Sequence, residues 1–116
     1  MSNSELEELL YLHIKCIHNK NGLPLPQCEY MFRKHTEGLS RNWKSDFVWP
    51  EYNLVFEVEG GVWSQGRHTR GQGFTNDVEK YNWLTLHGWK VLRGTAEHVK
   101  KGQAILWICE ALGYKY

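Results

Sequence analysis

Three acidic residues fall on two neighbouring segments that have the pattern of β-strands. Asp46 lies within residues 43–49, and Glu57 and Glu59 lie within residues 54–59. Carboxylate oxygens are the ligands that Mg²⁺ and Mn²⁺ prefer in proteins. If the two segments bring these acids together, the sequence predicts a divalent-metal site.

The four residues between the segments, 50–53, have the length and composition of a hairpin loop. Such a loop places Asp46 opposite Glu57, with Cβ atoms about 4.5–5.5 Å apart on one sheet face. Side chains alternate along a strand, so Glu59 shares that face and Lys44 lies opposite it. Opposed like charges destabilise a sheet, and a bound cation removes that repulsion. A solvated face on which Lys44 screens Glu59 is the alternative interpretation.

A glycine-rich segment, residues 60–73, follows the second acidic strand directly. Its glycines let the backbone approach a phosphate, and Arg67 and Arg70 can bind phosphate through paired hydrogen bonds. His68 is a candidate general base or phosphate ligand because histidine titrates near neutral pH. Trp63 is a candidate for stacking on a base. A solvated loop and a core tryptophan are the alternatives.

Helical and strand patterns surround these segments. Ser4 and Glu7 have the spacing of a capping box at the start of an apolar helical stripe. The expected elements are a helix from Ser4 to before Asn21, strands over 28–35, 43–49 and 54–59, a helix over 76–87, a strand over 89–93 and a helix over 103–112. This order predicts one α/β domain over residues 1–116, a mixed four-stranded sheet flanked by helices, with a right-handed crossover joining the last two strands.

The composition is that of a globular chain and narrows the possible partners. A net charge of +1 gives no overall basic field, so a nucleic-acid site must be a local patch. We expect no membrane span, because no apolar run approaches about 20 residues. Few cysteines (Cys16, Cys28 and Cys109) indicate a reducing compartment, with each thiol buried as a small hydrophobe. A zinc site from His13, Cys16, His18 and Cys28 is disfavoured, because their spacing matches no familiar ligand pairs.

The acidic hairpin resembles the PD-(D/E)XK nuclease superfamily, near the very-short-patch-repair branch and its compact bacterial and phage endonuclease-like proteins. The similarity begins with residues 43–51 and 54–61. It extends to Gly66–Gly71, Glu79–Asn82 and Gly88–Arg93, and covers roughly residues 28 to 112. The resemblance implies a restriction-endonuclease-like core of helix, three strands, helix and strand (αβββαβ).

By this resemblance Asp46 and Glu57 are the two motif acids. They would bind Mg²⁺ or Mn²⁺ together with the backbone carbonyl of Val58. Glu59 stands where the motif usually has lysine, so it would add a metal ligand or leave the protein inactive. Lys80, on the following helix, is the best replacement for the missing lysine.

Other residues near the predicted site have competing interpretations. Lys44 is the second candidate for the motif lysine and a candidate contact to DNA. An ion pair with Asp77 is the alternative role for Lys80. Glu5 or Glu8 of the first helix is a candidate for a further metal contact, although a solvated helix face is the favoured interpretation of both.

The resemblance implies metal-dependent hydrolysis of DNA phosphodiester bonds, leaving a 5′-phosphate. Nicked, mismatched or branched DNA are the expected substrates, and a homodimer or a larger phage or repair complex would supply specificity. The expected location is the cytoplasm of a bacterial or phage-infected cell. Two alternatives stay open: a junction-resolving homodimer, and a catalytically inactive nucleic-acid-binding module of the same fold.

Overall fold

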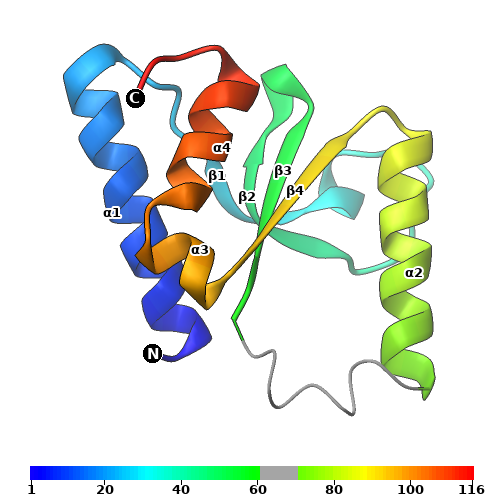
Figure 1. Cartoon of the computed structure of the whole chain (residues 1–116). Coiled ribbons are helices and arrows are strands. Elements are labelled where there is room, and N and C mark those ends of the chain that lie inside the picture. The colour runs from blue at the N-terminus through cyan, green and yellow to red at the C-terminus, as the bar shows by residue number, and fades with distance from the viewer. Residues whose placement is uncertain (61–70) are drawn as a thin grey trace.

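A computed structural model of the chain describes residues 1–60 and 71–116, and in it four strands form one mixed sheet with helices on both faces (Figure 1). The elements are α1 (Asn3–Asn21), β1 (Gln27–Met31), β2 (Lys44–Trp49), β3 (Leu54–Glu59), α2 (Gly71–Leu86), β4 (Lys90–Thr95), α3 (Ala96–Lys100) and α4 (Gln103–Leu112), with short 3-10 turns at Phe32–Lys34 and Pro50–Tyr52. The strand order is β1-β2-β3-β4. The predicted α/β architecture and its order of helix, three strands, helix and strand are confirmed.

Two apolar layers hold the helices against the sheet. Helices α1, α3 and α4 cover one face, and α2 covers the other (Figure 1). The larger layer contains the buried residues Leu6, Leu10, Ile14, Ile17, Leu23, Phe47, Trp49, Leu54, Phe56, Val58, Val99, Ala104, Ile105, Ile108, Cys109 and Leu112. The layer under α2 contains Tyr30, Phe32, Trp43, Val48, Val55 and Leu84. Strand β3 is buried on both faces and is therefore central, as its apolar composition predicts.

The hairpin register agrees with the sequence prediction. In the antiparallel β2–β3 pair Trp49 lies opposite Leu54, and Val48 lies opposite Val55. The loop between them is the 3-10 turn Pro50–Tyr52, closed by Asn53 in the left-handed region at φ 52°, which asparagine tolerates better than most residues. Strand β3 pairs with β4 in parallel. The parallel pairing of β3 with β4 agrees with the predicted order, and the right-handedness of the crossover stays a prediction.

The starts of two helices differ from the prediction. The capping box of α1 uses Ser2 and Glu5 rather than Ser4 and Glu7: the Ser2 hydroxyl accepts from the Glu5 N–H at 3.1 Å, and the Glu5 carboxylate accepts from the Ser2 N–H at 2.8 Å. Helix α2 begins at Gly71, five residues before the expected cap at Asn76.

Asn76 and Glu79 lie inside α2 rather than at its start, and both side chains accept hydrogen bonds from Arg41. The guanidinium donates to Asn76 Oδ1 and, at 2.8 Å, to Glu79 Oε1. Strand β1 also ends at Met31, earlier than expected, and the short helix α3 was not predicted. Thr95 and His98 form its capping box, a role that sequence rules assign to glutamate or glutamine.

The cysteines only partly follow the prediction that all three are buried. Cys109 is buried in the larger core layer, whereas Cys16 and Cys28 are exposed. None of the helices in the described ranges 1–60 and 71–116 is long and apolar enough to cross a membrane.

Candidate active site

The regular alternation of β2 breaks at Asp46. Phe47 belongs to the core layer under α1, as alternation from Trp49 requires. Ser45, two residues earlier, lies on the opposite side, where its hydroxyl donates to Glu57 at 2.6 Å. Facing this point in β1, Glu29 has a positive φ of 50°. The irregular backbone therefore lets neighbouring side chains leave the pattern expected of a flat strand.

The Asp46 carboxylate replaces a sheet partner at this break. Its Oδ2 accepts a hydrogen bond from the backbone N–H of Val58 at 2.8 Å. It also lies beside two acids from other elements: ligand atoms of Glu7 in α1, Glu29 in β1 and Asp46 are all within 4.8 Å of one another. We call these three residues the acid group.

The acid group differs from the one expected from the hairpin. Asp46 lies close to Glu7 and Glu29, and among the described residues no group of three acids joins it to Glu57 and Glu59. The expected convergence of Asp46, Glu57 and Glu59 in one group is therefore not found in this part of the chain, because that expectation assumed unbroken alternation through Asp46. Glu7 also replaces Glu5 and Glu8 as the first-helix acid, since Glu5 caps its own helix.

The buried carboxylate of Glu57, on the α2 side of β3, is surrounded by hydrogen-bond donors. Its side chain accepts from Lys80 Nζ at 2.6 Å and from Ser45 Oγ at 2.6 Å through one oxygen, Oε2. The other oxygen, Oε1, accepts from the Tyr81 hydroxyl at 3.1 Å. Glu57 and Lys80 are each 8% exposed. A buried carboxylate is stable only with such compensation.

Lys80 therefore pairs with Glu57, and the alternative ion pair with Asp77 is wrong. Its ammonium also donates to the backbone carbonyl of Lys44. These two contacts fix Lys80 between β2 and β3, although it belongs to α2. The lysine expected from the following helix thus lies in direct contact with one motif acid.

Glu59 and Lys44 do not face each other as expected. Glu59 accepts from the Arg93 guanidinium of β4 at 3.1 Å, and the same guanidinium lies 4.9 Å from the centre of the Tyr81 ring. Lys44 is exposed and lies 3.5 Å from Glu29. Lys44 is therefore a neighbour of the acid group rather than a partner of Glu59.

Burial and repulsion perturb the acids of this region. Burial, followed by the charges of Asp46 and Glu29, raises the pKa of Glu7 to about 7. Burial is also the largest cause that raises the pKa of Asp46 to about 6; the charges of Glu57 and Glu29 add to it, while the Val58 N–H and Lys80 oppose it. Burial and the charge of Glu57 likewise raise the pKa of Tyr81, so its hydroxyl stays protonated and donates.

The pKa of Asp46 is therefore affected by charges from both the acid group and the Glu57–Lys80 pair. A cavity of about 220 Å³ opens beside it, lined by Ser4, Glu7, Glu8, Tyr11, Cys28, Asp46 and Phe47. The donors facing this region are carboxylate oxygens, which suit Mg²⁺ or Mn²⁺ better than softer metals. A cation among them would convert mutual repulsion into attraction.

Several predicted site residues lie outside the residues that the structure describes: Trp63, Arg67, His68 and Arg70. The predicted role of the Val58 carbonyl as a metal ligand stays a prediction. The alternative zinc ligands, His13, Cys16, His18 and Cys28, do not form a metal-binding group within residues 1–60 and 71–116.

Four residues of the site were not found by sequence reasoning: Glu7, Glu29, Ser45 and Tyr81. Glu7 follows the buried Leu6 on α1, so a closer reading of the helical stripe places it near the sheet. Tyr81 follows Lys80 in the sequence and was treated only as an apolar position. Glu29 and Ser45 carry no comparable signal, because they enter the site through an irregular backbone.

Comparisons with known proteins leave the family open. No protein-family model matches the chain, and no solved structure matches it. The chain is similar to two proteins of Mycobacterium tuberculosis, the uncharacterized protein MT2308 of strain CDC 1551 / Oshkosh and the uncharacterized protein Rv2248 of strain H37Rv. Each is 27% identical over 81 residues, which are 70% of this chain and 27% of the relative. The matched region thus spans about a quarter of the length of these relatives.

Proposed function

We propose that this protein is a metal-dependent DNA endonuclease that hydrolyses phosphodiester bonds with Mg²⁺ or Mn²⁺ at Asp46. The observation that carries the proposal is the buried contact between Lys80 and Glu57, at 2.6 Å. Glu59 occupies the place of the motif lysine, and this was the main argument against catalysis. A lysine supplied from α2 removes that argument.

The residues around Asp46 fit a divalent cation. Asp46, Glu7 and Glu29 offer oxygen atoms within 4.8 Å of one another. The pKa values of Glu7 and Asp46 are raised to about 7 and about 6, first because burial disfavours their charged forms and then because neighbouring carboxylates repel them. In the proposal Asp46 and Glu7 bind the cation, and Glu57 holds Lys80 beside it. Metal binding by Glu57 and by the Val58 carbonyl rests on the resemblance alone.

The chain's own groups then have distinct roles. A Mg²⁺ ion held by Asp46 and Glu7 would supply an acidified water molecule and a positive charge opposite the phosphate. Lys80 adds a fixed positive charge, and its desolvated position makes that charge more effective than one in water. Ser45 and Tyr81 hold the Glu57 carboxylate in place through hydrogen bonds to its two oxygens.

A cleavage assay on intact, nicked, mismatched and branched DNA tests the proposal. We expect cutting with Mg²⁺ or Mn²⁺ and none with a chelator. Asp46→Asn and Lys80→Met should each lower the rate by at least about 100-fold, because each removes a charge from the reaction centre. Glu110→Gln, which changes an exposed acid on α4, is the matched control and should cut like the parent.

Folding of each variant is checked by circular dichroism, so that a lost rate is not a lost fold. No cutting of any DNA form, together with no uptake of Mn²⁺ by titration calorimetry, would reject the enzyme. Metal-independent binding of DNA without cutting would instead support the inactive nucleic-acid-binding module.

A further inference from the structure

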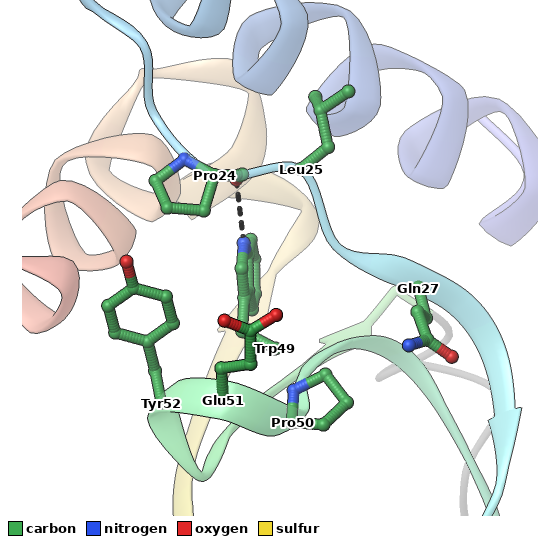
Figure 2. A pocket seen from close by; sticks show the side chains of 7 residues that line it. All are labelled: Pro24, Leu25, Gln27, Trp49, Pro50, Glu51 and Tyr52. Carbon is green, nitrogen blue, oxygen red and sulfur yellow. Dashed lines mark hydrogen bonds between the residues drawn. The ribbon is translucent and has the colours of Figure 1, made fainter.

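A second hollow lies at the β2–β3 turn, away from the acid group. It is a cavity of about 290 Å³ lined by Pro24, Leu25, Gln27, Trp49, Pro50, Glu51 and Tyr52. Figure 2 shows Pro24 and Leu25 on one wall, the turn residues on the other, and Trp49 between them. The Trp49 indole N–H donates to the Pro24 carbonyl at 2.8 Å, which ties the two walls together.

The rim of this cavity combines exposed apolar surface with a carboxylate. Leu25 is 44% exposed and Tyr52 is 40% exposed, although both are large hydrophobic side chains. Glu51 is also exposed, and within residues 1–60 and 71–116 it takes part in no ion pair. A carboxylate that lines the same cavity as the exposed Tyr52 ring, and has no counter-charge among the described residues, is suited to a cationic ligand.

The protein itself fills two similar arrangements with arginine. Arg41 lies 4.4 Å from the centre of the Trp43 ring and pairs with Glu79 at 2.8 Å. Arg93 of β4 makes the corresponding contacts with the ring of Tyr81 and the carboxylate of Glu59. In both, the guanidinium stacks on a ring while its N–H groups bind a carboxylate.

The cavity at the turn has the aromatic and acidic parts of this arrangement. Among the described residues, no lysine or arginine stacks on the rings of Trp49 or Tyr52. A guanidinium can bind Glu51 while its flat face meets the Tyr52 ring, and the aliphatic stem can cover Leu25. The volume suffices for one such side chain.

We propose that this cavity is a docking site for an arginine side chain presented by a partner protein. The site is independent of the nuclease activity, because it lies at the turn and shares no residue with the acid group. It therefore offers a way to attach this short chain to another protein while the acid group faces its substrate.

Nuclear magnetic resonance on the ¹⁵N-labelled full chain tests the proposal. The probe is a blocked glycyl-arginyl-glycine peptide, compared with its citrulline analogue, which keeps the shape and loses the charge. We expect the arginine peptide to shift the indole N–H signal of Trp49 and the backbone signals of Glu51 and Tyr52. The citrulline peptide should bind at least about fivefold more weakly.

Two variants separate the proposed contact from general attraction between charges. Glu51→Gln should weaken binding of the arginine peptide at least about fivefold. Glu97→Gln is the matched control: Glu97 lines another cavity with Trp107 but already pairs with Lys101, so binding should stay within about twofold. Both positions are exposed, and an unchanged spectrum away from the substitution shows that the fold is kept.

The proposal is overturned if citrulline and arginine peptides bind equally, if Glu51→Gln binds like the parent, or if the shifts map outside the turn. Absence of any shift at about 20 mM peptide, a concentration that detects even very weak binding, also overturns it. If the same preparation neither cuts DNA nor takes up Mn²⁺, the proposed function is rejected and the peptide result is unaffected.

Discussion

The affinity of the acid group for Mn²⁺ should depend steeply on pH. A carboxylate must be ionised to bind a metal, so protons compete with the cation. The pKa values of Glu7 and Asp46 are raised to about 7 and about 6. Raising the pH from about 5.5 to about 7.5 increases the ionised fraction of Glu7 about 25-fold and that of Asp46 about fourfold. Together they predict an affinity about 100-fold higher at the upper pH.

Isothermal titration calorimetry at the two pH values measures this change directly. Repeating the titration near pH 6.5 in buffers of different ionisation enthalpy counts the released protons, and about one per Mn²⁺ is expected. Glu7→Gln removes the larger contribution, so about a fourfold pH effect should remain. Glu110→Gln should keep the full effect. A change of less than about threefold in the parent, or no proton release, would refute the reasoning.

Metal affinity should rise with pH, whereas the unfolding free energy of the metal-free protein should fall with pH. Since the folded pKa of Asp46 is raised, the folded state binds more protons than the unfolded state between about pH 4 and pH 7. Its unfolding free energy should therefore fall as the pH rises through this window. The contribution of Asp46 is at most about 3 kcal/mol, and less because the carboxylate is partly solvated. Saturating Mn²⁺ should abolish the trend, and urea denaturation with and without the metal measures it.

Two further predictions concern stability. Lys80→Met or Glu57→Gln alone should lower the unfolding free energy by about 3–5 kcal/mol, because each leaves a buried partner without its counterpart. The loss in the double variant should be at least about 1 kcal/mol smaller than the sum of the two single losses. If urea denaturation shows that the losses simply add, the two side chains are not directly coupled. Gly94→Ala should cost about 1–3 kcal/mol, since the added Cβ would lie 2.9 Å from Cζ of the fully buried Phe56. A melting temperature equal to the parent's would contradict this prediction, because it would mean that the Phe56 ring moves aside at no cost.

Local patterns in the sequence were enough to predict most of the fold. The apolar runs of β2 and β3, the loop of four residues and the helical stripe of α1 each depend on neighbours close in the chain. For this reason the bounds Leu54–Glu59 and Gln103–Leu112 and the pairing of Trp49 with Leu54 agree with the structure. The start of α2 was misplaced because Asn76 lies inside the helix, where its side chain accepts from Arg41, a residue 35 positions away, instead of capping the first turn.

The sequence predicted only some residues of the candidate site. Asp46, Glu57 and Lys80 were singled out from residue type, position and resemblance, and the structure places Lys80 against Glu57. The acids that lie beside Asp46 could not be predicted from the sequence. Alternation predicts Glu57 and Glu59, whereas the irregular backbone near Asp46 gives it Glu29 and Glu7 as neighbours.

The sequence by itself determined the order of elements, the hairpin register and the residues able to bind a cation or hold a charge, because these depend on local periodicity and side-chain chemistry. Only the tertiary structure decided which acids meet. Glu7 reaches Asp46 through the packing of α1 on the sheet, and the positive φ of Glu29 lies where β1 and β2 leave regular pairing. Both depend on contacts between segments far apart in the chain, and no local pattern encodes them.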